Sequence, residues 1–99
     1  MIPPAPDTIE RTILDLLRAR GAERTVGPMD VARALGGDHP DGWGPLMPHV
    51  RRAAVRLMQQ GRVVILRKGR PVDPDDFRGV YRLALGEGKR EGEGNSSSV

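Results

Sequence analysis

The chain has 99 residues, which allows one domain, and only three of them are aromatic. There is no cysteine, which excludes disulfides, thiolate nucleophiles and Cys-ligated zinc, and the formal net charge is +3. No apolar run approaches the roughly 18–20 residues that span a bilayer, and the N-terminus lacks the pattern of a signal peptide. We therefore expect a small cytoplasmic domain with an aliphatic core and no contact with membranes.

The charge is unevenly distributed along the chain. Residues 1–48 contain five arginines against seven acidic residues, whereas residues 49–85 contain nine basic residues against three aspartates. A basic segment beside an acidic one is typical of proteins that bind polyanions on one face. A bias toward arginine codons is the alternative; it explains the preference for Arg over Lys, but not the segregation.

The first half of the sequence predicts two helices. Residues 7–20 form an amphipathic helix, in which Asp7 and Glu10 have the spacing of a capping box and Ile and Leu recur on one face. A short extended stretch, 24–26, precedes a second helix over 28–35, which begins at a proline and ends at paired glycines.

The second half contains a loop, a long helix and two strands. Residues 38–44 are predicted to be a loop in which Trp43 packs over the first turn of the next helix, with base stacking by an exposed indole as the alternative. The third helix spans 45–60. Strands over 62–67 and 80–85 then form a hairpin with a twelve-residue loop.

This order predicts an α+β winged helix-turn-helix: three helices, a C-terminal β-hairpin wing and a short extra strand between helices one and two. The domain is expected over 7–85, after a lead of residues 1–6. Residues 86–99, rich in Gly, Glu and Ser, are expected to be disordered. The core is expected to contain Leu17, Leu35, Val50, Leu57, Val64 and Leu83.

Several stretches resemble a known family. They include PMDVARAL at 28–35, WGPLMPHVR at 43–51 and, most specifically, KGRPVDP at 68–74. The chain resembles a small bacterial domain family of unknown function built on the winged-helix fold. Some members resemble fusions to a Cys-rich module, which a chain without cysteine cannot contain. The resemblance implies a fold but no activity, since winged helices bind DNA, RNA or protein.

The third predicted helix presents the first candidate site. At about 100° per residue, Arg51, Arg52 and Gln59 lie opposite the apolar stripe, with Arg56 beyond them. In a major groove Arg pairs with guanine and Gln with adenine. The alternative is an ordinary solvated face, and Pro48 replaces a side chain that could reach a base.

Lys68 and Arg70 in the predicted wing loop form the second candidate site, because wings lay basic side chains along phosphates. Asp73 and Asp76 reduce the charge of this loop. Ion pairs between these aspartates and neighbouring arginines, which would hold the loop in shape, are the alternative role.

The remaining polar residues predict neither a cofactor nor an enzyme. His39 and His49 are too few for a zinc site, which needs three or four ligands, and no nucleophile–base arrangement is visible. The sequence therefore favours a protein that binds duplex DNA, as a transcriptional regulator or accessory factor. The alternative is an adaptor that binds another protein, or a second copy of itself, and no nucleic acid.

Overall fold

The computed structural model describes residues 4–21 and 24–86. The predicted disorder of the C-terminal segment concerns residues outside these ranges, apart from Gly86. The elements follow in the order α1 (Pro6–Arg20), β1 (Thr25–Val26), α2 (Pro28–Gly36), α3 (Pro40–Trp43), the 3₁₀ helix η1 (Gly44–Leu46), α4 (Met47–Gln59), β2 (Val63–Arg67), β3 (Arg70–Pro71) and β4 (Arg82–Leu85). The predicted α+β class is confirmed.

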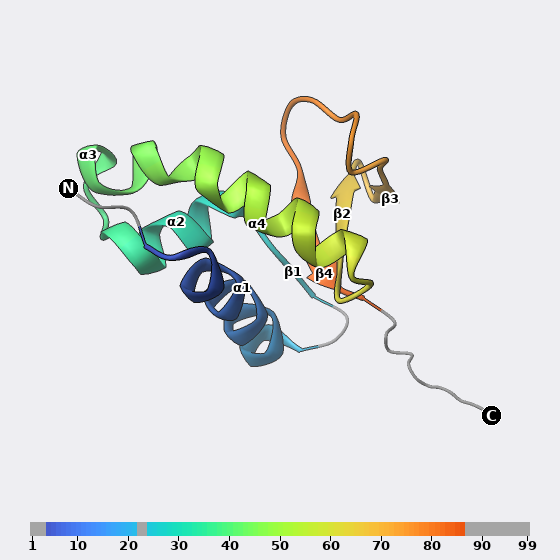
Figure 1. Ribbon diagram of the computed structural model, residues 1–99, viewed down its shortest axis with the longest axis horizontal. Coiled ribbons are helices and arrows are strands. Elements are labelled where there is room, and N and C mark those ends of the chain that lie inside the picture. Colours follow the sequence, from blue (N-terminus) through green and yellow to red (C-terminus); the bar gives the residue numbers. More distant parts are fainter. Residues whose placement is uncertain (1–3, 22–23, 87–99) are drawn as a thin grey trace.

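The long helix α4 lies across α1 and α2, and the sheet stands at its C-terminal end (Figure 1). The strand order is β1-β4-β2-β3, and every pair is antiparallel. Leu83 in β4 lies between Val26 of β1 and Ile65 of β2. The short strand after α1 thus extends the C-terminal hairpin, an arrangement compatible with a winged helix. None of the described helices combines the length and apolar character needed to cross a membrane.

Aliphatic side chains from the three longer helices and the sheet form one core. The predicted core residues that are buried are Leu17, Val50, Leu57 and Leu83. Leu35 is half-buried against them. The prediction for Val64 was wrong: Val63 and Ile65 are buried instead, because side chains alternate between the faces of a strand and Val64 occupies the opposite phase.

The start of α1 differs from the prediction. The N-cap is Ala5, whose side chain makes no capping bond, and Pro6 occupies the first turn. The predicted capping box of Asp7 and Glu10 was therefore wrong. Proline suits the first helical position because its missing N–H is not needed there, and the carboxylate of Glu10 bonds a guanidinium on α4 instead.

The predicted loop over 38–44 was also wrong, since these residues belong largely to α3 and η1. The local sequence provides a cap and a start. The ring Nδ1 of His39 accepts a hydrogen bond from the backbone N–H of Asp41 at 3.1 Å, and Pro40 occupies the first helical position. As a consequence α4 begins at Met47 rather than at residue 45.

Two glycines allow α3 to pack against α2. A Cβ on either Gly36 or Gly42 would collide with the backbone of the other, so the close approach requires both to be glycine. Trp43 ends α3, and its indole is half-buried against the core, as a packing role requires. The indole N–H donates to the Asp38 carbonyl at 3.2 Å, which closes the segment on itself.

The predicted antiparallel pairing of residues 62–67 with 80–85 is confirmed, since β2 pairs with β4, but the loop between them contains a further strand, β3. Lys68 and Gly69 form the turn between β2 and β3, with φ angles of +53° and +80°. Positive φ at both central residues is the conformation that matches the twist of a two-residue hairpin. The prediction missed this strand pair because proline at position 71 argues against a strand. At a sheet edge, however, the missing N–H costs no ladder bond.

Candidate nucleic-acid interface

The outer face of α4 is the first part of the candidate interface. Arg52 and Gln59 are both exposed there, where helical periodicity predicted them. Arg52 Nη2 lies 2.7 Å from Nδ1 of His49, one turn earlier, and the guanidinium is the donor. This contact orients Arg52 along the helix while its remaining N–H groups stay accessible to solvent.

Arg51, by contrast, makes its contacts within the protein. Its guanidinium carbon lies 3.7 Å from the centroid of the Phe77 ring, and Nη2 donates to the Phe77 carbonyl at 2.5 Å. Phe77 is buried and packs edge-on against Tyr81, with ring centroids 5.3 Å apart. The loop between β3 and β4 is thus held against α4, which makes Arg51 a packing residue.

The packing of Arg51 and Phe77 also determines the environment of Tyr81. Burial of Tyr81 raises the pKa of its phenol above the ordinary value of 10.0, and the positive charge of Arg51 lowers it by a smaller amount. The ring therefore stays neutral over the physiological range. It acts as a core side chain at the base of the loop.

Arg56 is also engaged within the fold. Its Nε donates to the carboxylate of Glu10 at 2.7 Å, which ties α4 to α1. The carboxyl side chain is 17% exposed and the guanidinium side chain 38%. Arg56 lies beyond the outward stripe, as predicted. Its charge, however, is paired with that of Glu10, which comes from the first half of the chain.

The turn between β2 and β3 is the second part of the candidate interface. Lys68 and Arg70 are exposed on either side of Gly69, and the chain has no acidic residue between 61 and 72. Within the described ranges no carboxylate lies within ion-pair distance of either residue. Two exposed cations thus lie two residues apart on a tight turn.

Sequence analysis missed the part played by Arg67, directly before the turn. It is half-buried, and its Nε donates to the carbonyl of Val80 at 3.2 Å, which anchors the returning loop to β2. The one available signal was its place at the end of a strand facing a long loop. Asp73 also has a structural role, since its carboxylate accepts from the N–H of Asp75 at 2.9 Å. No described residue forms an ion pair with Asp73 or Asp76, so the predicted pairing was wrong.

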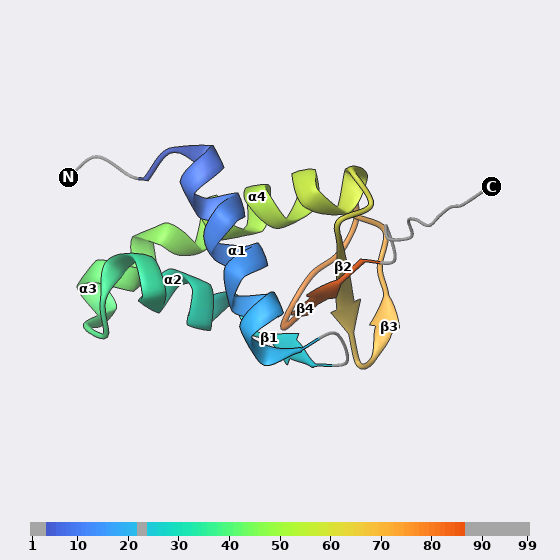
Figure 2. The same ribbon diagram turned by 90° about the horizontal axis from the view of Figure 1, so that it is seen from below.

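Strand β2 separates the C-terminus of α4, where Gln59 lies, from the turn of Lys68 and Arg70. That strand begins beside the C-terminus of α4 and ends at the turn, which projects away from the helix (Figure 2). A rigid strand and a tight turn therefore fix the separation between the exposed cations of the helix and those of the wing. A ligand that contacts both must be long, and its negative charges must be spaced along it.

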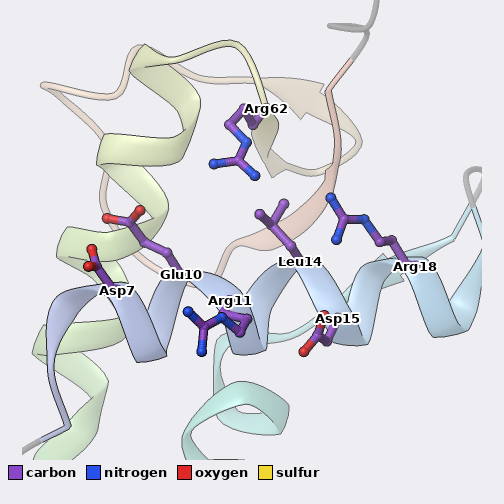
Figure 3. A pocket seen from close by; sticks show the side chains of 7 residues that line it. All are labelled: Asp7, Glu10, Arg11, Leu14, Asp15, Arg18 and Arg62. Atoms are coloured by element: carbon purple, nitrogen blue, oxygen red, sulfur yellow. The ribbon is translucent and has the colours of Figure 1, made fainter.

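A separate cavity of about 420 Å³ lies beside α1, outside the predicted site. Figure 3 shows the side chains of Arg18 and Arg62 approaching Leu14 from α1 and from the α4–β2 connection. The lining residues comprise three arginines and three acids: Arg11, Arg18, Arg62, Asp7, Glu10 and Asp15. The formal charges of the lining thus sum to zero. Among the described residues, no group of three or more His, Asp or Glu side chains is placed to hold a metal ion.

The fold and this surface define a small α+β domain with exposed cations on one helix and on the wing. A family model described as "Protein of unknown function (DUF3253)" matches residues 6–86, and the chain belongs to that family. The resemblance to a family of unknown function is thereby confirmed. No curated protein matches the chain.

Proposed function

We propose that this protein binds duplex DNA through the outer face of α4 and the β2–β3 turn, as a cytoplasmic regulator or accessory factor without catalytic activity. Arg52 and Gln59 of α4 face the major groove, and Lys68 and Arg70 of the wing contact phosphates. Arg51 and Arg56 support this surface from inside and are not contacts.

The observation that carries this proposal is the uncompensated charge of the turn. Lys68 and Arg70 are exposed beside each other on a constrained hairpin, with no described carboxylate near enough to pair with either. Basic side chains that have no acidic partner attract polyanions such as nucleic acid. A DNA backbone supplies phosphates at a regular spacing, which a small anion does not.

The predicted recognition is weakly sequence-specific. The outward stripe of α4 offers one arginine and one glutamine as base-reading side chains. Its other positions include Pro48 and Val55, whose side chains form no hydrogen bonds. Phosphate contacts fix position without reading sequence, and few base-reading side chains give little discrimination between sites. Binding should therefore depend strongly on salt and weakly on base sequence.

The test is a salt titration of binding to a fluorescent mixed-sequence duplex, followed by anisotropy. The logarithm of affinity should fall linearly with the logarithm of salt concentration, by about 0.9 per phosphate contacted. Arg70→Ala should weaken binding and flatten this slope by roughly one unit. Lys68→Asn should do the same. Because asparagine tolerates the positive φ at that position, the turn itself should be preserved.

Arg18→Ala is the matched control, since it removes the same charge from the cavity beside α1. Its affinity and salt slope should match those of the wild type. If the control weakens binding as much as Arg70→Ala, attraction by net charge explains the result and the proposed surface is wrong. Undetectable binding at about 50 mM salt, where phosphate contacts remain strong, would also refute the proposal.

A further inference from the structure

Exposed apolar side chains gather at one place in the described part of the chain. The two large hydrophobic residues exposed there are Met29, at 41%, and Val80, at 83%. They come from α2 and from the segment before β4, and both line the same groove of about 530 Å³. Single exposed apolar residues are ordinary, but their convergence on one groove is typical of an interaction surface.

The walls of this groove are held in place by hydrogen bonds and packing contacts. On one side the carbonyl of Val80 accepts from Arg67 at 3.2 Å, and the neighbouring Tyr81 is anchored in the core by its packing on Phe77. On another side Met47, at the start of α4, is half-buried against the core. The groove is therefore preformed, and little ordering is needed before a ligand enters.

The rim of the groove is positively charged. Arg82 lines it and is fixed by hydrogen bonds to Thr25, from Nε to the hydroxyl at 3.1 Å and from Nη2 to the carbonyl at 3.3 Å. The guanidinium of Arg67 lies beside Gly79, another residue of the lining. The lining contains one carboxylate, that of Asp30.

The carboxylate of Asp30 already has partners within the protein. It accepts from the N–H of Gly27 at 3.1 Å and lies 3.7 Å from a guanidinium nitrogen of Arg20. A ligand therefore meets an apolar floor and guanidinium groups at the edge, with little negative charge left to repel an acid. This combination favours a partner with both large apolar side chains and carboxylates.

We propose that this groove binds an acidic segment of a partner protein. One or two large apolar side chains of the segment pack against Met29, Met47 and Val80, while its carboxylates contact Arg67 and Arg82. A second copy of this chain fits less well, because in a two-fold interface both sides carry the same arginines and the same single carboxylate. Duplex DNA lacks the apolar side chains that would fill the floor.

The experiment uses the full chain, labelled with ¹⁵N, and two synthetic peptides. In one, leucines alternate with glutamates; in the other, lysines replace the glutamates. The acidic peptide should shift the amide signals of Met29, Val80 and Arg82 in a saturable way, and the lysine peptide should leave them unchanged. The double variant Met29→Ala, Val80→Ala should bind the acidic peptide about tenfold more weakly, because it loses apolar area.

The double variant also separates this proposal from DNA binding. Both side chains are exposed, so the fold should survive, and affinity for duplex DNA should equal that of the wild type. Absence of shifts at about 1 mM acidic peptide, a very weak affinity limit, would overturn the proposal. So would a concentration-dependent dimer in sedimentation that disappears in the double variant, since a second copy would then occupy the groove.

Discussion

Replacing Arg51 with methionine should destabilise the fold without affecting DNA binding. Methionine keeps an unbranched, apolar stem of similar reach but removes the guanidinium. The substitution therefore loses the stacking on Phe77 at 3.7 Å and the hydrogen bond to the Phe77 carbonyl. Because Phe77 and Tyr81 belong to the core, release of the loop should affect global stability as well as local order.

The magnitude follows from these two contacts. Arg51 is half-buried, so its cation–π contact contributes about 0.5–1 kcal/mol. A hydrogen bond from a charged donor contributes about 1.5 kcal/mol at the lower end of its range. A loss of about 2 kcal/mol is expected. At roughly 4–8 °C per kcal/mol for a domain of this size, Tm should fall by roughly 8–16 °C.

Thermal unfolding followed by circular dichroism measures this loss, and urea unfolding gives the free energy directly. The matched control is Arg52→Met, the next residue on α4, whose exposed guanidinium contacts the ring of His49. Its stability should lie within about 0.5 kcal/mol of the wild type, while its affinity for DNA should fall. Equal melting temperatures for the two variants would refute the structural role of Arg51.

Three further outcomes are expected. Gly42→Ala should lower the free energy of unfolding by about 2 kcal/mol or more, measured in urea, because its Cβ meets the backbone of Gly36; an unchanged value would show that α3 can shift at no cost. Since burial raises the pKa of Tyr81 above 10.0 in the folded state, the unfolded chain loses the phenolic proton first. Stability from this group should be constant below about pH 10 and lost above it, and urea melts of Tyr81→Phe should lack that alkaline loss. Glu10→Gln should cost about 1 kcal/mol, and a double-mutant cycle with Arg56→Met should show coupling that high salt reduces; zero coupling would exclude the α1–α4 ion pair as a source of stability.

Much of the fold could be predicted because local patterns determine it. Apolar periodicity placed α1, α2 and α4 to within two residues at each end, and β-branched residues indicated β2. The predictions failed where a contact from elsewhere decided the conformation. The pair of Gly36 and Gly42 lets α3 pack against α2 where a loop was expected, and an edge position lets Pro71 lie in a strand.

For the candidate site too, local patterns predicted some features and tertiary contacts decided the others. Helical geometry alone placed Arg52 and Gln59 on the outer face, and composition alone marked Lys68 and Arg70 as a basic wing; the structure finds all four exposed. Periodicity is a property of neighbouring residues, so the sequence contains it in full. The structure alone determined which arginines are already engaged.

Arg51 bonds a residue 26 positions away, and Arg56 bonds one 46 positions away. The five basic residues of the candidate site look alike in composition, whether exposed or engaged, since charge is counted without regard to partners. A guanidinium is satisfied by whatever carbonyl, ring or carboxylate the folded chain brings within reach, and only tertiary packing creates that proximity. The sequence by itself thus determined how much positive charge the second half has, and the tertiary structure determined how much of it remains available to a partner.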